Sequence, residues 1–137
     1  MSNRLNPYVN FKGNARQAME FYKSVFGGEL TMSTFGEFGA SVNPDEKDLI
    51  MHAQLEAPNG YWLMGSDTPA HMDYKPGSNY SISLSGDDEA VLSGHWKKLS
   101  EGANILQALE KAPWGDSFGM LVDKFGTTWL VNIAAKR

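Results

Sequence analysis

The stretch that decides the fold is residues 49–64, LIMHAQLEAPNGYWLM. Its first nine residues alternate between apolar and more polar side chains, which is typical of a β-strand with one buried face. Asn59-Gly60 predicts a tight hairpin turn, and Tyr61 to Met64 predicts the returning strand. One face of the first strand is expected to carry Leu49, Met51, Ala53, Leu55 and Ala57, and the other Ile50, His52, Gln54 and Glu56.

Upstream of this hairpin, the sequence predicts a strand, a helix and a second strand. Residues 5–11 alternate weakly and stop just before Gly13. Asn14 is placed to cap a helix, because apolar side chains then recur at helical spacing until the glycine pair at 27–28. Residues 29–35 predict the next strand. The first half of the chain is therefore expected to run strand, helix and three strands.

The second half predicts the same order. Strands are expected at residues 79–85, 103–109, 117–123 and 127–134, and Asp87 or Asp88 can cap a helix that ends near Ser100. Direct similarity between the halves is thin, and its best local match aligns Tyr61–Met64 with Thr128–Val131. Two such units suggest fused copies of one supersecondary structure.

The predicted fold class is α+β, with two tandem βαβββ modules in one domain spanning residues 1–137. Module one covers about residues 1–70 and module two about residues 78–137. A helix on one face of each sheet leaves the other face uncovered. We expect these two faces to turn toward each other and to form a central trough, with the helices outside. The sequence does not give the role of the loops at residues 36–48 and 68–77.

Composition excludes several classes of protein. The chain has 137 residues, with 12 basic and 16 acidic side chains and a net charge of −4. It has no basic run, which argues against nucleic acid and membrane surfaces as partners. No apolar stretch is long enough for a membrane helix. The absence of cysteine excludes disulfides and thiolate catalysis and fits a reducing compartment, so we expect a cytoplasmic protein.

Short motifs follow one another along nearly the whole chain. In order they are YVNF (8–11), GNA (13–15), EFY (20–22), VFGG (25–28), HA (52–53), LMGSD (63–67), WGD (114–116), FG (118–119), DKFG (123–126) and VN (131–132). Their order and spacing resemble the PhnB-like branch of the vicinal oxygen chelate superfamily, which contains glyoxalases, bleomycin-resistance proteins and dioxygenases. The resemblance implies paired βαβββ modules that form an incomplete barrel around the trough, and it implies the homodimer that is usual in this family. Some members of this branch carry a 3-demethylubiquinone 3-methyltransferase label, yet the sequence shows no glycine-rich turn of the kind found at Rossmann-type sites.

The same resemblance implies four metal-ligand positions. In this sequence they fall at about Pro7, on Met64, near Tyr80 and on Leu130. Divalent metals need nitrogen or oxygen donors that converge, and none of these side chains is a good ligand for a hard ion. The sequence therefore predicts no metal cofactor.

His52 is the titratable side chain of greatest interest. Alternation places it on the same strand face as Gln54, and that face is expected to line the trough if the apolar face packs on the helix. Imidazole exchanges protons near neutral pH, so His52 is the best candidate for a catalytic residue, and with Gln54 for a ligand contact. The simpler alternative is a structural histidine bonded across the sheet, because the sequence shows no carboxylate partner.

Three further side chains are candidate ligand contacts. Trp114 and Phe118 flank a loop and are expected to form an aromatic wall for an apolar ligand, although a dimer contact explains them equally well. Asp67 follows Gly65-Ser66, where it caps a turn or, as the minority interpretation, contacts a ligand near the trough mouth.

Three functional hypotheses follow. The first is metal-independent binding of a small, partly apolar molecule in the trough. The second is a metal-dependent lyase, isomerase or dioxygenase of the glyoxalase type, with unusual ligands such as His52 and Glu56. The third is a non-catalytic dimeric interaction module. Whether the chain is an enzyme, and which molecule it binds, the sequence does not tell.

Overall fold

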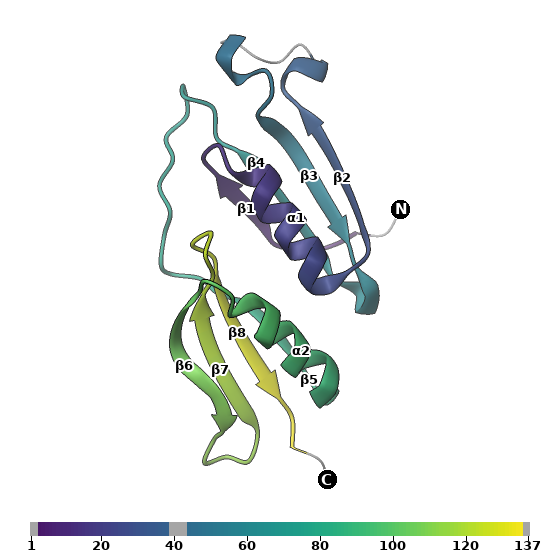
Figure 1. The fold of residues 1–137 in the computed structure, drawn as a ribbon, viewed down its shortest axis with the longest axis vertical. Coiled ribbons are helices and arrows are strands. Elements are labelled where there is room, and N and C mark those ends of the chain that lie inside the picture. Colours follow the sequence, from purple (N-terminus) through teal and green to yellow (C-terminus); the bar gives the residue numbers. More distant parts are fainter. Residues whose placement is uncertain (1–2, 39–43, 136–137) are drawn as a thin grey trace. The chain divides into compact units, whose positions relative to one another are not determined.

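A computed structural model describes residues 3–38 and 44–135 of the chain. The chain divides into two compact units, residues 1–76 and residues 77–137. In each unit a single long helix packs on one face of a four-stranded sheet, as Figure 1 shows. The predicted α+β class and the repeated βαβββ order are confirmed.

In the first unit, helix α1 packs on a mixed sheet whose strands are ordered β1-β4-β3-β2. β1 runs parallel to β4, and the other neighbours are antiparallel. Apolar side chains recur on one side of α1, where Met19 and Tyr22 are fully buried, and Phe11, Ala53 and Leu55 of the sheet are buried too. The elements are β1 (Tyr8–Phe11), α1 (Ala15–Phe26), β2 (Glu29–Thr34), β3 (Ile50–Glu56) and β4 (Trp62–Asp67).

A β-bulge changes the predicted faces of β3. Ser33 on β2 pairs with His52, while the next residue, Thr34, pairs with Ile50, so Met51 is an extra residue. A bulge of this kind reverses the alternation beyond it. The prediction that Ile50 shares a face with His52 is therefore wrong, and Ile50 is buried with Ala53.

The start of α1 is capped by a residue distant in sequence. Asn14 occupies the N-cap position, as predicted, but its side chain makes no capping hydrogen bond. Instead, Asp67 Oδ1 accepts hydrogen bonds from the backbone N–H groups of Gly13 (2.8 Å) and Ala15 (2.9 Å). These donors would otherwise be unsatisfied at a helix N-terminus. The pairing of β1 with β4 brings Asp67 to this place, because Phe11 pairs with Asp67.

The second unit repeats the arrangement with sheet order β5-β8-β7-β6, in which β5 is parallel to β8. Asp88 caps its helix by accepting a hydrogen bond from Val91 N, as predicted. Leu92 and Leu99 of that helix are buried, as are Leu121 and Val131 of the sheet that it covers. The elements are β5 (Ile82–Gly86), α2 (Glu89–Leu99), β6 (Asn104–Lys111), β7 (Ser117–Val122) and β8 (Thr128–Ile133).

The two hairpin tryptophans face different sides of their sheets. Trp129 is buried on the α2 side, whereas Trp62 is half-buried on the side away from α1, where the Arg4 guanidinium lies 3.6 Å from its ring centroid. The predicted match of Tyr61–Met64 with Thr128–Val131 is thus one residue out of register. A shift of one residue along a strand exchanges its two faces.

The described connecting segments contain three short 3₁₀ turns, Gly36–Phe38, Pro44–Glu46 and Pro58–Gly60. The last holds the predicted Asn59-Gly60 turn, in which both residues adopt positive φ (69° and 75°), as tight hairpins require. Of the predicted loop at residues 36–48, positions 39–43 lie outside the described residues. The loop at residues 68–77 is mostly exposed, and its Ala70 N donates to Glu46 Oε2 at 2.7 Å.

Packing of α2 on its sheet depends on Gly119. A Cβ atom at this position would lie 2.8 Å from Trp96 Cη2 and 3.0 Å from Leu109 Cα. We expect Gly119→Ala to lower the free energy of unfolding by about 2 kcal/mol through overpacking, measured by urea denaturation. Gly94→Ala is the matched control, because nothing lies within 4 Å of its added Cβ within α2. It should be neutral or stabilise by up to about 1 kcal/mol, and equal losses in both variants would contradict this packing.

Candidate functional site

The face of each sheet that its helix does not cover is the place to look for a site. We call it the helix-free face. In the first unit, a Cβ atom at Gly65 would lie 3.4 Å from the Met19 sulfur of α1, so Gly65 belongs to the face that the helix covers. The residues that alternate with Gly65, and their partners on the neighbouring strands, form the helix-free face. The helix-free face of this unit carries Tyr8, Asn10, Thr31, Ser33, His52, Gln54, Trp62, Met64 and Ser66.

His52 has a side-chain partner on this face. Its Nδ1 lies 3.2 Å from the hydroxyl of Tyr8, and the two ring centroids are 5.7 Å apart. Both His52 and Gln54 are half-buried and lie two residues apart on β3, as predicted. The sequence did not indicate Tyr8 as the partner. Tyr8 lay within a predicted strand, but only the parallel pairing of β1 with β4 brings it near β3.

The second unit contains a hollow of about 330 Å³ at one end of the β6–β7 hairpin. Trp114 and Phe118 supply its aromatic wall, with ring centroids 6.2 Å apart and an interplanar angle of 59°. Trp114 is 65% exposed, which is unusual for so large an apolar side chain. The hollow is lined by Gln107, Glu110, Lys111, Ala112, Pro113, Trp114 and Phe118.

The turn that carries Trp114 is held by hydrogen bonds. Ala112 N donates to Asp116 O at 2.7 Å, and Gly115 N donates to Ala112 O at 2.9 Å. The Asp116 carboxylate accepts from Asn132 Nδ2 at 3.1 Å and from Ala135 N at 3.0 Å, which ties the turn to β8 and the segment after it. The exposed indole is therefore presented by an ordered turn.

The polar side of the hollow results from irregularities in β6. Gln107 pairs with Met120, and Glu110 pairs with Phe118. Gln107 and Glu110 are three positions apart on β6, whereas Met120 and Phe118 are only two positions apart on β7. This register brings Gln107 and Glu110 to the same face, where Gln107 Nε2 donates to Glu110 Oε1 at 3.3 Å. The hollow thus combines two aromatic rings with a carboxylate and an amide, which is typical of small-molecule sites.

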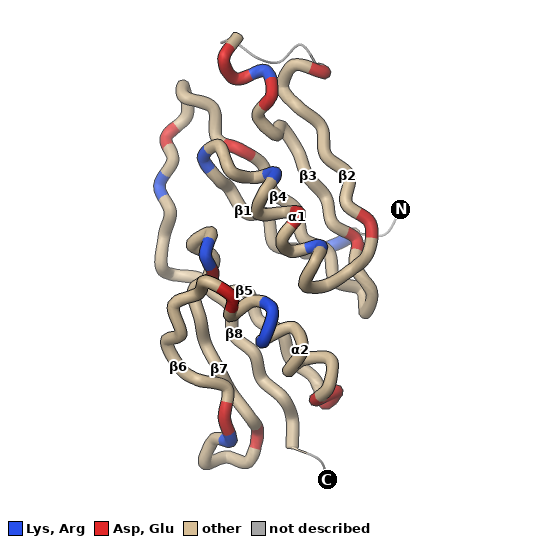
Figure 2. The backbone as a smooth tube through the Cα atoms, in the orientation of Figure 1, with Lys and Arg blue, Asp and Glu red and all other residues tan. Residues whose placement is uncertain are grey.

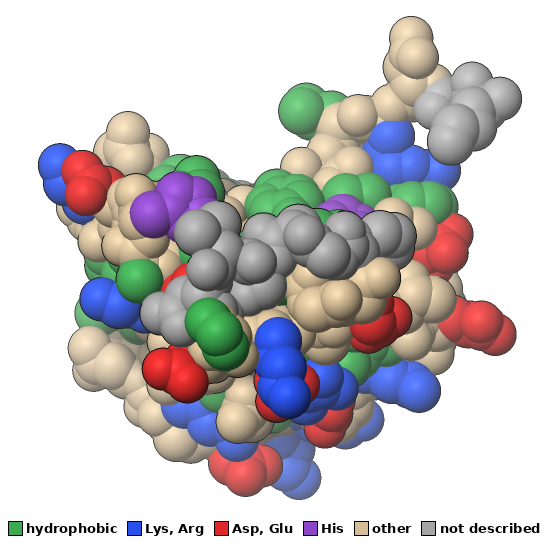
Figure 3. Space-filling view, turned by 90° about the horizontal axis from the view of Figure 1, so that it is seen from above, with side chains coloured by type: hydrophobic (Ala, Val, Ile, Leu, Met, Phe, Trp, Pro, Cys, Tyr) green, Lys and Arg blue, Asp and Glu red, His purple; other side chains and the backbone are tan. Residues whose placement is uncertain are grey.

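Asp67 lies on the other face of the first sheet, toward α1. It is 4% exposed, and Oδ2 accepts from Ile50 N at 2.9 Å in addition to the two bonds at the start of α1. Its carboxylate thus serves the backbone, in line with the turn-cap interpretation. Among the other histidines, His95 is half-buried in α2 and His71 is exposed. Figure 3 shows that histidine side chains reach the surface beside hydrophobic ones.

The metal-ligand positions implied by the superfamily resemblance can be placed by strand pairing. Met64 pairs with Tyr8 in the first sheet, and Leu130 pairs with Ser83 in the second. Tyr80 precedes β5 and is exposed. Thioether, phenol, hydroxyl and hydrocarbon groups do not fit a hard divalent ion, which prefers carboxylate and imidazole donors. Within residues 3–38 and 44–135, no three His, Asp or Glu side chains gather as a metal site requires.

None of the helices in the described parts of the chain has the length and apolar character needed to cross a bilayer.

Comparison with known proteins gives one family and one fold. The family model described as 3-demethylubiquinone-9 3-methyltransferase matches residues 3–132. Protein YjdN of Escherichia coli is 26% identical, over 97% of each chain.

Two solved structures extend the comparison. The crystal structure of protein PA1353 from Pseudomonas aeruginosa is 37% identical, covers 98% of this chain and 100% of its own, and superposes with a TM-score of 0.82. A member of the glyoxalase/bleomycin resistance protein/dioxygenase superfamily from Sphaerobacter thermophilus is 19% identical, covers 97% and 98% of the two chains, and has a TM-score of 0.59. At that identity, the second structure shows the shared fold.

Proposed function

We propose that this chain, which belongs to the 3-demethylubiquinone-9 3-methyltransferase family and has the fold of the glyoxalase/bleomycin resistance/dioxygenase superfamily, binds a small, partly apolar molecule without a metal ion. The observation that carries the proposal is the hollow beside Trp114 and Phe118 in the second unit. Its volume of about 330 Å³ matches the lower end of small-molecule sites.

The chemistry of the lining indicates what part of a ligand fits. A flat, apolar ring can stack on Trp114 or meet the edge of Phe118, because aromatic rings favour offset and edge-to-face contacts. The Glu110 carboxylate accepts one hydrogen bond, from Gln107, and retains further acceptor capacity. A ring that carries a hydrogen-bond donor at its edge would satisfy both kinds of contact.

Methyl transfer, which the family description implies, finds no support in the residues. Nucleotide-type cofactors commonly bind at a helix N-terminus that follows a strand. Here the N–H groups at the start of α1 are engaged by Asp67, and Val91 N at the start of α2 is engaged by Asp88. These two carboxylates occupy the positions that a phosphate or carboxylate of a cofactor would take. We therefore derive no step through a methyl donor.

Metal-dependent chemistry through His52 and Glu56 requires the two side chains to converge. They lie four residues apart on β3, which corresponds to about 13 Å along the strand. Two ligands of one ion, each about 2 Å from it, have their donor atoms within about 4 Å of each other. This separation favours the metal-independent alternative. The homodimer that the family resemblance implies stays a prediction.

Titration with N-phenyl-1-naphthylamine, a neutral aromatic amine whose fluorescence rises in apolar surroundings, tests the proposal. We expect saturable binding by the wild-type protein. Trp114→Ala should weaken binding about tenfold, because removal of a stacking ring costs about 1–2 kcal/mol. The affinity should be the same with a chelator and with added zinc.

Leu106→Ala is the matched control for this variant. Leu106 is an exposed apolar side chain on β6 that does not line the hollow. Its replacement should leave the affinity for N-phenyl-1-naphthylamine unchanged. Absence of saturable binding, or equal weakening by the two replacements, would overturn the proposal.

A further inference from the structure

The Tyr8–His52 pair bridges two strands that are not neighbours. β4 lies between β1 and β3, and the pair meets above it on the helix-free face. Ala53 pairs with Gly65, so His52 lies beside Ser66, one step further along the antiparallel pair. A small side chain at position 66 leaves room for a phenol and an imidazole to meet.

Neutral side chains share the face of this pair: Met64 pairs with both Tyr8 and Gln54, and the other neighbours are polar. Asn10, Gln54 and Ser66 share its face, and among the described residues their side chains make no hydrogen bond to the protein. Ser33 Oγ donates to the backbone carbonyl of His52 at 3.5 Å. Side chains with unused hydrogen-bond donors and acceptors around one titratable ring are typical of a site for a polar ligand.

The charged side chains of this sheet's strands lie at strand ends or on the opposite face from the pair. The four strands of this sheet carry charge only at their ends, at Glu29, Glu56 and Asp67, and Figure 2 shows these ends in red. Asp67 faces α1. Glu29 and Glu56 are opposite each other on β2 and β3, and Glu56 is also opposite Trp62, whose ring is covered by the Arg4 guanidinium. No charged residue of the strands therefore neutralises a proton held by His52.

The phenol suits the imidazole in both of its protonation states. A tyrosine hydroxyl can donate to neutral Nδ1 or accept from a protonated Nδ1–H. When the imidazole is neutral and Tyr8 donates to Nδ1, the single N–H proton of the ring is on Nε2. In the protonated state both ring nitrogens donate, one to Tyr8 and the other to a ligand. Tyr8 thus satisfies Nδ1 throughout, and Nε2 remains for the ligand.

We propose that Tyr8, His52 and Gln54 form a second binding site, specific for a small oxygen acid such as a carboxylic acid or a phenol. The ligand binds as its anion: an acid that is still protonated loses the proton of its O–H bond to water, and the imidazole of His52 takes up one proton from water at Nδ1, where the Tyr8 hydroxyl turns from donor to acceptor. The resulting oxyanion accepts a hydrogen bond from Nε2–H of His52, and Nδ1–H donates to Tyr8. The amide of Gln54 supplies a further donor. This site belongs to the first unit, so it does not depend on the hollow in the second unit.

NMR of the histidine ring nitrogens in ¹⁵N-labelled protein tests the proposal, with benzoate and 4-nitrophenol as probes and benzamide as the matched neutral control. The His52 signals, identified by their loss in His52→Gln, should move to the protonated pattern with either acid and stay in place with benzamide. The acid that saturates at the lower concentration shows whether carboxylate or phenolate is preferred. The His71 signals, in an exposed loop, should not change.

Variants show whether the NMR response to benzoate comes from the Tyr8–His52 pair. Tyr8→Phe keeps the ring and removes the hydroxyl, and should weaken the binding of benzoate about fivefold. His52→Gln should weaken it more than tenfold. Trp114→Ala should leave the benzoate response intact, which separates this site from the hollow. Unmoved His52 signals at millimolar benzoate, or equal movement with benzamide, would overturn the proposal, and both are read in the wild-type protein.

Discussion

Replacing Asp67 with alanine should lower the free energy of unfolding by about 4 kcal/mol. This carboxylate is buried and accepts hydrogen bonds from the backbone N–H groups of Gly13, Ala15 and Ile50. Alanine leaves three donors without partners, and each unsatisfied buried donor costs about 1–3 kcal/mol. Urea denaturation followed by far-ultraviolet circular dichroism measures the loss.

Two variants make the Asp67 prediction specific. Asp67→Asn retains one carbonyl oxygen and turns an amide toward a backbone donor, so it should lose an intermediate amount of stability. Asp73→Ala removes a carboxylate whose ion pair with Lys75 (3.7 Å) is exposed, and should change stability by less than about 0.5 kcal/mol. Retention of wild-type stability by Asp67→Ala would show that this residue is free to serve a ligand.

Asp123→Ala should have a comparable effect in the second unit, about 3 kcal/mol. The Asp123 carboxylate is 4% exposed and closes the turn between β7 and β8. Oδ1 accepts from Phe125 N at 2.8 Å and Thr127 N at 3.1 Å, and Oδ2 accepts from the buried indole Nε1 of Trp129 at 2.8 Å. Tryptophan fluorescence during urea denaturation reports this loss.

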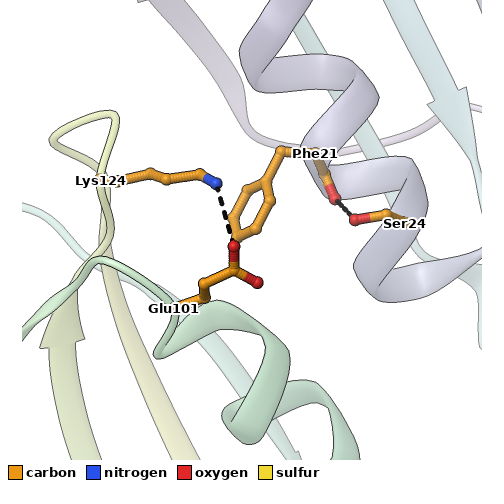
Figure 4. Close-up of polar contacts among 4 residues, drawn as sticks. All are labelled: Phe21, Ser24, Glu101 and Lys124. Carbon is orange, nitrogen blue, oxygen red and sulfur yellow. Dashed lines mark hydrogen bonds and ion pairs between the residues drawn. The ribbon is translucent and has the colours of Figure 1, made fainter.

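The control for Asp123 is an acidic residue on the surface of the same unit. Glu101 lies 3.9 Å from Lys124 in an exposed ion pair, which is drawn in Figure 4. Exposed pairs contribute at most about 1 kcal/mol. Glu101→Ala should therefore stay within that range, and an equal loss in both variants would remove the special role of Asp123.

Local pattern was sufficient for the elements of this fold. The helix at Ala15–Phe26 follows from apolar spacing and from the glycine pair after it, and both features act within a few residues. Asp87 or Asp88 was predicted as a cap, and the partner that Asp88 has in the structure, Val91, is only three residues away. The helix of each unit and the strands beside it were therefore predictable from short stretches of chain.

Features that depend on strand pairing were not predictable. The bulge at Met51 reverses the face of Ile50, and it exists only in relation to β2. Asp67 caps a helix that begins 52 residues earlier in the sequence, because β1 pairs with β4. Alternation within one strand contains no information on the register with another.

The candidate sites show the same division. Trp114 and Phe118 were identified because aromatic residues near a loop suggest a binding surface, and they do line one hollow. Gln107 and Glu110 were missed, because irregular pairing of β6 places them on one face. Tyr8 was missed because its partner His52 is 44 residues away. Whether these side chains contact a ligand stays a prediction.

A crystal structure of the protein soaked with N-phenyl-1-naphthylamine tests ligand binding in the hollow most directly. The account predicts an aromatic ring against Trp114 and Phe118, with its amine near Glu110, in crystals grown with a chelator. An empty hollow at saturating probe, or a ring bound only elsewhere on the chain, would contradict it.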